Sequence, residues 1–191
     1  MRDGAISKAD RRNLQLYLRL ILSYTDFKHA YRSAQYLLDQ HDVYAREGGD
    51  DFLLRALYCS LVVAYARPFN SDGSSRLGRV PRLTKELFEV LSAEEVTVHD
   101  HILHCRNKLI AHTDAEAVDV VLFVATDLPN EMVIPEQNDA LAPFTREFTE
   151  VVLALTEKSH RWCVERRHHL EPLVRHLLER RSFVQTTDQS E

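Results

Sequence analysis

The chain has 191 residues, of which 45% are hydrophobic and 28% charged. This length suits one domain with a sizeable core and an appended hairpin or tail. Only five glycines and six prolines are present, which disfavours an all-β sandwich and favours long helices. The net charge of −5 argues against a broad nucleic-acid-binding coat but allows a local basic site.

The three cysteines, Cys59, Cys105 and Cys163, are far apart and form no C-x-x-C spacing. Each lies in an apolar or helical stretch, so we expect buried free thiols and a reducing, cytoplasmic environment. The N-terminus leads into charged residues rather than a signal core. The longest apolar stretches, 14–22 and 53–66, are interrupted by arginines and are shorter than a membrane span. We therefore expect no membrane contact.

The first part of the chain predicts helix. Residues 14–22 alternate like a strand, but their leucines favour helix, and we interpret them as helical. Residues 26–45 carry apolar side chains at spacings of three and four, which predicts an amphipathic helix. Thr25 or Asp26 can cap its first amides, and Gly48-Gly49 can end it.

A helix predicted over residues 52–66 is apolar nearly all round and should therefore be central. It is expected to stop at Arg67-Pro68, because the residue before a proline avoids helical angles. Residues 70–81 are rich in Ser, Gly and Arg and indicate a loop. A short helix is predicted over residues 83–91.

Ser92 and Glu95 form a capping-box pattern that starts a further helix, called here the motif helix. Its apolar positions follow helical spacing and predict one buried stripe. The stripe consists of Val98, Ile102, Cys105 and Leu109.

Alternating apolar residues after 118 and a turn containing Pro129 predict a β-hairpin near 118–135. From Pro143 onward the spacing is helical again, and Pro172 should kink or divide this helix before residues 173–181. We therefore predict a mainly α fold, a bundle of about five helices with a small hairpin. Residues 1–182 would form the single domain and 183–191 a disordered tail.

The end of the motif helix carries the residues that best suit catalysis. Arg106 can hold a phosphate through its planar guanidinium, and His112 can transfer a proton to or from a ribose oxygen. Asn107 can orient the substrate, and Asp114 can fix the tautomer of His112. This chemistry requires no metal and no cofactor. The alternative is that His112 only ends the helix, favoured there by the helix dipole.

Geometry limits joint action of Arg106 and His112. In an unbroken helix these side chains would be about 120° apart around the axis and about 9 Å apart along it. The helix must therefore loosen before His112, or a second copy of the chain must complete the site. Spacing alone is a weak signal, because Arg161 and His168 have nearly the same spacing.

Other charged groups allow two interpretations each. Arg67 precedes a basic loop, so that it can either contact phosphate or satisfy carbonyls at its helix end, and the second is favoured. His99, His101 and His104 suggest either a metal site or a solvated face, and the solvated face is favoured. The arginine- and histidine-rich stretch 160–181 is likewise interpreted as a solvated helix face. Glycine-rich phosphate loops and G-x-S-x-G are not found in the sequence.

The string Arg106-Asn107, four further residues and His112, followed by Thr113-Asp114, resembles the signature of the HEPN superfamily. It looks like the bacterial members of unassigned function, and residues 65–69 also look like part of that subgroup. The resemblance covers roughly residues 25–115 and the long C-terminal helix.

This resemblance implies a helical bundle that forms a homodimer, with the two motif copies facing across the interface. Active HEPN members are metal-independent endoribonucleases, often toxins paired with an antitoxin or defence proteins. The implied catalytic pair is Arg106 and His112, with Asn107 as polar neighbour. Other members are inactive and bind RNA, nucleotides or protein partners, which is the second functional interpretation.

Overall fold

The computed structural model describes residues 6–40, 52–70, 74–75, 78–83, 85–110, 121–126, 132–136 and 144–178. The described part is mainly α, with four α-helices and a small antiparallel hairpin. The helices are α1 (Lys8–Asp39), α3 (Phe52–Asn70), α4 (Ala93–His104) and α5 (Arg146–Val174). The hairpin consists of β3 (Val121–Ala125) and β4 (Met132–Glu136). Shorter elements are β1 (Ser74–Ser75), β2 (Gly78–Arg79), the 3-10 helices η1 (Lys85–Val90) and η3 (Arg175–Leu177), and the π-helix η2 (Cys105–Ile110).

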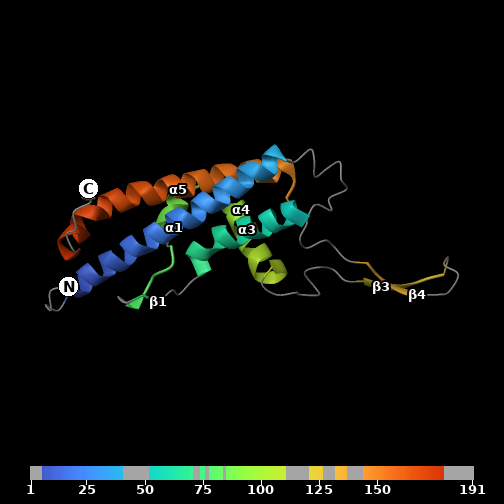
Figure 1. Cartoon of the computed structure of the whole chain (residues 1–191), viewed down its shortest axis with the longest axis horizontal. Coiled ribbons are helices and arrows are strands. Elements are labelled where there is room, and N and C mark those ends of the chain that lie inside the picture. Colours follow the sequence, from blue (N-terminus) through green and yellow to red (C-terminus); the bar gives the residue numbers. More distant parts are fainter. Residues whose placement is uncertain are drawn as a thin grey trace, which may run out of the picture.

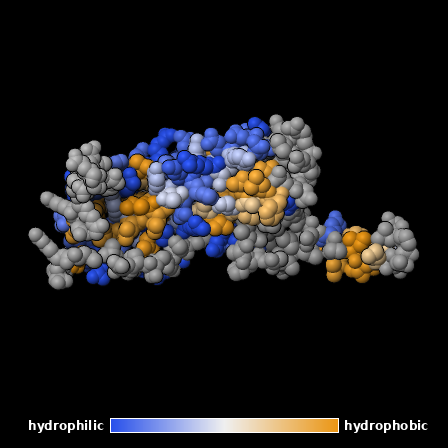
Figure 2. Space-filling model, viewed as in Figure 1, coloured by the Kyte–Doolittle hydropathy of each residue, from blue (hydrophilic) through white to orange (hydrophobic). Residues whose placement is uncertain are grey.

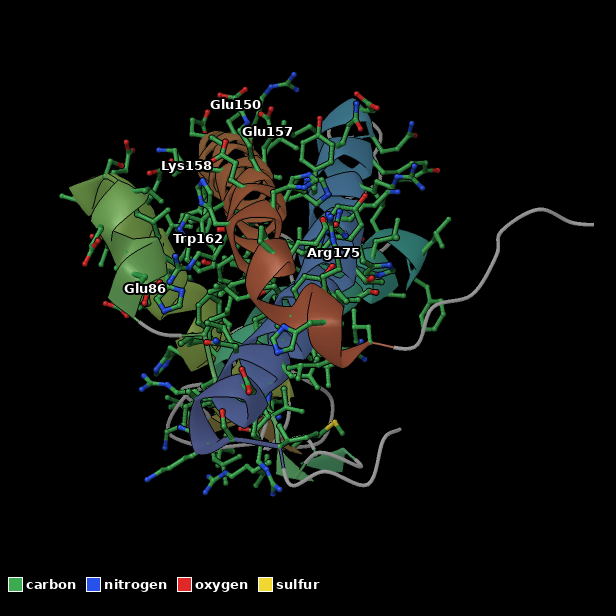
Figure 3. The ribbon with its side chains drawn as sticks, turned by 90° about the vertical axis from the view of Figure 1, so that its left-hand side faces the viewer. Glu86, Glu150, Glu157, Lys158, Trp162 and Arg175 are labelled. Atoms are coloured by element: carbon green, nitrogen blue, oxygen red, sulfur yellow. The ribbon has the colours of Figure 1, made fainter. Side chains whose placement is uncertain are left out.

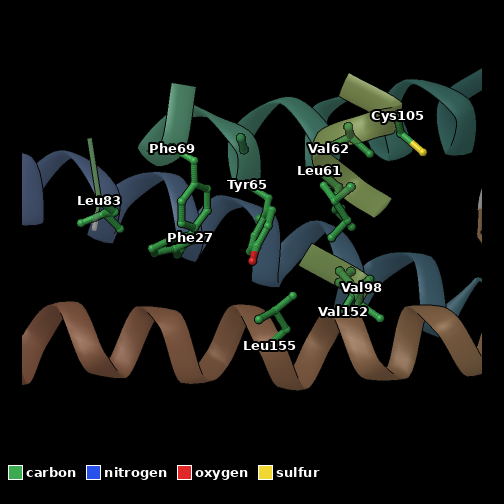
Figure 4. Packing of buried hydrophobic residues seen from close by; sticks show 14 of the residues in the cluster. Phe27, Leu61, Val62, Tyr65, Phe69, Leu83, Val98, Cys105, Val152 and Leu155 are labelled. Carbon is green, nitrogen blue, oxygen red and sulfur yellow. The ribbon is translucent and has the colours of Figure 1, made fainter. Parts of the chain in front are cut away.

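The two longest helices, α1 and α5, pack side by side along most of their length, and α3 packs against α1 (Figure 1). Their facing side chains form one apolar core, to which α4 adds its own stripe (Figure 4). Phe27, Leu61, Tyr65 and Leu155 are fully buried in it. Burial of such side chains is the main favourable contribution to folding.

Helix α1 is longer than predicted and continuous, so the expected helix start at Thr25 or Asp26 is wrong. The cap is Ser7, whose hydroxyl accepts a hydrogen bond from the Asp10 amide at 3.0 Å. The Thr25 hydroxyl instead donates to the Ile21 carbonyl within the helix at 3.5 Å. Residues 14–22 are helical as interpreted. Residues 41–45 and Gly48-Gly49 lie outside the described residues.

A buried arginine fixes the chain segment that precedes η1. Arg19 is 2% exposed, and its Nε donates to the Pro81 carbonyl at 2.5 Å. A guanidinium nitrogen also donates to the Val80 carbonyl at 3.5 Å. These charge-assisted bonds compensate for burying the cation. Sequence patterns did not reveal this role, because it depends on a contact between distant segments.

The predicted end of the helix at Arg67-Pro68 is wrong. Helix α3 continues through Pro68 to Asn70. Pro68 is fully buried, and its carbonyl accepts a hydrogen bond from the Leu83 amide at 2.9 Å. Phe69, the next residue, packs in the core beside Phe27 and Tyr65. Burial of this last turn offsets the loss of one helical donor at the proline.

The extended α3 is also longer than the apolar stretch recognised in the sequence. Residues Phe52–Phe69 have a mean hydropathy of 1.3 and, by length and composition alone, could cross a membrane. Half of this window is buried inside the structure. Core helices of globular proteins share these properties, and α3 packs against α1 as such a helix does.

The motif helix starts as predicted. The Ser92 hydroxyl accepts from the Glu95 amide at 3.1 Å, and the Glu95 carboxylate accepts from the Ser92 amide at 2.6 Å. Val98, Ile102 and Cys105 are buried, which confirms the predicted stripe up to Cys105. The short helix expected over 83–91 is present as the 3-10 helix η1.

The hairpin is confirmed, with Phe123 paired to Ile134 at its centre. Residues 118–120 and 127–131, which include the predicted turn, lie outside the described residues. Helix α5 is capped by Thr145 and continues through Pro172 to Val174, so the division expected at Pro172 is displaced to the start of η3. The expected tail, 183–191, lies outside the described residues.

We expect Ser92→Ala to lower the free energy of unfolding by about 1 kcal/mol, because the first turn of α4 loses its side-chain acceptor. Urea unfolding followed by circular dichroism measures this. Thr97→Ala is the matched control, because the Thr97 hydroxyl is exposed and donates its hydrogen bond to the Ala93 carbonyl within the helix rather than capping an end. Equal stability of the Ser92→Ala variant and the wild type would contradict the importance of the cap.

Candidate functional site

The candidate site lies where α4 changes from α-helical to π-helical winding. The π-helix begins at Cys105, whose amide still bonds to the His101 and Ile102 carbonyls. A π-helix forms bonds to the fifth residue instead of the fourth, so the helix widens here. Such segments are rare and occur often at functional sites. The winding therefore departs from α-helical geometry one residue before Arg106, and His112 lies outside the described residues.

Arg106 lies at the edge of the buried face, as the spacing predicts, and is half-buried. Its guanidinium donates a hydrogen bond to the Asn107 side-chain oxygen at 2.8 Å. Cys105, one residue earlier, is buried and hydrogen-bonded by the Tyr58 hydroxyl of α3. The buried cysteine thus anchors the backbone while the arginine beside it reaches the surface.

The structure brings Arg106 and Asn107 together. It does not describe His112, the second member of the predicted catalytic pair. His112 and Asp114 lie outside the described residues, which end at Ile110 in this region. Among the described residues, no carboxylate lies within ion-pair distance of Arg106. Its neighbour Asn107 is neutral, so within the described part of the chain no carboxylate balances the charge of the guanidinium.

Arg67 is placed far from Arg106. It follows Tyr58, the α3 residue that contacts Cys105, by nine positions, or about 13 Å along a helix. Its guanidinium pairs with the Asp26 carboxylate of α1 at 3.4 Å. Burial raises the pKa of Asp26, while the hydrogen bond from Arg67 opposes this rise. Arg67 therefore links α3 to α1, a role that neither sequence interpretation included.

A buried polar pair lies in the core between α3 and α4. The Tyr65 hydroxyl and the Nδ1 atom of His99 are 3.0 Å apart. His99 is only 4% exposed and lies edge-on to the rings of Phe69 and Phe88. The solvated face predicted for the three histidines of α4 is therefore wrong for His99. Its burial was not evident in the sequence, because no apolar residue marks that position.

Burial sets the protonation of this pair. It lowers the pKa of His99, against a smaller opposite effect of Asp100, so the imidazole is neutral near pH 7. It also raises the pKa of Tyr65 well above its ordinary value. One neutral hydrogen bond thus satisfies two polar groups in an apolar core.

The other two histidines of α4 are exposed. His101 lies against the rings of Phe144 and Phe148, and its Nε2 is 3.4 Å from the Cys105 thiol. Within the described parts of the chain, no group of three His, Cys, Asp or Glu side chains could hold a metal ion.

The basic residues of α5 are largely paired with carboxylates, as expected for a solvated face. Arg161 pairs with Glu157 within α5, and Arg175, the first residue of η3, pairs with Glu171 of α5, each at 2.8 Å. Arg166 reaches Glu86 of η1 at 3.0 Å, beside a shallow groove of about 440 Å³. Figure 3 shows this side of the molecule. Lining the groove are Glu86, Glu89, Val90, Trp162, Glu165, Arg166 and His169.

Comparison of the chain with protein-family models, with curated proteins and with solved structures gives no match.

We expect the free energy of unfolding to fall as the pH drops below 6.5, the ordinary pKa of histidine. Because the pKa of His99 is lower in the folded state, the unfolded chain binds more protons in this range. The double variant Tyr65→Phe/His99→Phe removes both polar partners together. It should show a shallower fall in stability between about pH 7.5 and about pH 5.5.

Urea unfolding at the two pH values measures the difference. The control is His104→Asn, which changes an exposed histidine of the same helix. An unchanged pH dependence in the double variant, or an equal reduction of the pH dependence by His104→Asn, would contradict the assignment to His99.

Proposed function

We propose that this chain is an HEPN-like, metal-independent endoribonuclease of the toxin or defence type that acts as a homodimer. Arg106 binds the phosphate of the scissile bond, and His112 transfers the proton. Asn107 orients Arg106, and Asp114 supports His112. The proposal takes from the HEPN resemblance the pairing of these residues and the need for two copies of the chain.

One observation carries the proposal: Arg106 lies half-exposed at the π-widened end of α4, bonded to the neutral Asn107 amide. A guanidinium that retains its full charge can take a phosphate through two parallel hydrogen bonds. The buried stripe and the cap at Ser92 hold the backbone of this helix in position. Precise placement of a phosphate-binding group is what such catalysis needs.

A catalytically silent interaction or nucleotide-binding module is the second candidate. Exposed apolar side chains on the hairpin favour an interaction role, and the net charge of −5 disfavours broad RNA contact. In this case Arg106 and His112 would contribute to helix termination or ligand binding without chemistry.

We expect the purified protein to cleave mixed RNA in the presence of EDTA. His112→Ala should lower the cleavage rate by about 100-fold or more, because general acid–base catalysis is lost. Arg106→Ala should lower it comparably. Arg106→Lys should retain only part of the activity, because lysine keeps the charge but not the bidentate fork. Gel analysis of labelled RNA fragments measures these rates.

The matched control is Arg161→Ala/His168→Ala, which removes a pair of nearly the same spacing from the exposed surface of α5. Its activity should equal that of the wild type. Equal RNA decay for wild type, His112→Ala and Arg106→Ala, with all three folded, would reject the ribonuclease and leave the interaction module.

A further inference from the structure

The β3–β4 hairpin stands clear of the helical bundle (Figure 1), and its face seen in Figure 2 is largely apolar. The register places Leu122 and Val124 on one face with Val133, while Phe123 and Ile134 share the other. Leu122 is 67% exposed, Val124 54% and Val133 65%. A two-stranded hairpin with this much apolar surface in water is at best marginally stable by itself.

The two outer edges of the hairpin are not equivalent. Pro135 of β4 is paired with Leu122, but it has no N–H to donate to β3. The pair must therefore be a non-hydrogen-bonded one, with the Pro135 nitrogen facing the outer edge of β4. That edge lacks a donor in its middle. The outer edge of β3 lacks no backbone donor. The N–H and C=O groups of Leu122 and Val124 point outward along this edge.

The β3 strand is suited to pairing with itself. Its sequence, Val121 to Ala125, contains no charged residue, so antiparallel self-pairing brings no like charges together. Pairing centred on Phe123 sets this ring beside the same ring of a second copy. A strand that is apolar on both faces pairs best with another strand of this kind. Most edge strands alternate apolar and polar residues and therefore match β3 less well than a second copy of β3 does.

We propose that β3 pairs antiparallel with β3 of a second copy of this chain, forming a four-stranded sheet in the order β4–β3–β3–β4. Leu122 lies opposite Val124 of the second copy in a hydrogen-bonded pair, and Val124 lies opposite its Leu122. These two pairs exchange four backbone hydrogen bonds. The contact is isologous and closes as a dimer. The paired residues lie outside the motif at 106–112 in the sequence, so the pairing can be tested without ribonuclease activity. This dimer supplies the second copy of the chain that the proposed function requires.

Charge substitutions at the two opposed positions test both the interface and its register. Leu122→Lys/Val124→Lys places lysine opposite lysine at both pairs. It should raise the dimer dissociation constant at least about tenfold. Leu122→Glu/Val124→Lys places glutamate opposite lysine and should restore a dimer. The control Val133→Lys puts a charge on the same face in β4 and should leave the dimer intact.

Sedimentation equilibrium of the full chain measures the dissociation constants. None of the altered residues belongs to the helical core, so thermal unfolding of the helices should be unchanged in every variant. A monomeric wild type, or a lysine–lysine variant as dimeric as the wild type, would overturn the proposal. A glutamate–lysine variant as monomeric as the lysine–lysine variant would overturn the register.

A cysteine pair gives an independent test. Phe123 would face Phe123 of the second copy with Cα atoms about 4.5 Å apart, within disulfide range. Phe123→Cys should therefore form a disulfide-linked dimer under mild oxidation. Ile134→Cys would lie three strand spacings, or about 14 Å, from its copy and should not. Equal cross-linking of the two variants, or none above the wild-type level for Phe123→Cys, would overturn the proposed pairing.

Discussion

The carboxylate of Glu95 links the start of the motif helix to the rest of the bundle. Its Oε2 atom accepts one hydrogen bond from the Ser92 amide and another from the Lys158 ammonium of α5, each at 2.6 Å. Burial acts to raise the pKa of Glu95, but Lys158 and the Ser92 amide outweigh it and hold this pKa below its ordinary value. The group is therefore charged at neutral pH and binds both partners strongly. One side chain fixes where α4 begins and how it lies against α5.

From this fixed start, the buried stripe determines which side chains reach the surface eleven residues later. Val98, Ile102 and Cys105 point into the core, and Arg106 therefore falls at the rim. The change to π winding at Cys105 occurs where α4 still contacts α3 through Tyr58. A widened helix held on its buried side can present a polar side chain outward without losing its anchor. This combination suits a phosphate-binding group as well as a recognition surface.

Local patterns predicted the features that depend on neighbours in the sequence. The capping box at Ser92, the stripe of α4 and the pairing of β3 with β4 all follow from such patterns. Arg19, His99 and Pro68 could not be predicted in this way. Each is a polar or helix-breaking residue whose burial is stabilised by a distant partner, namely the Pro81 carbonyl, the Tyr65 hydroxyl and the Leu83 amide. For the site, the edge position of Arg106 was predictable, but the π winding was not, because no sequence period distinguishes it from an α-helix.

The buried Arg19 also has a consequence for the order in which the chain can assemble. Its bonds to Pro81 and Val80 join segments about sixty positions apart, and closing so large a loop costs entropy that local helix formation does not. We therefore expect α1 to form before the segment that leads to η1 and α4 is fixed against it. In that order of assembly, the N-terminal helix would serve as the template for the connection that leads to the Arg106 helix.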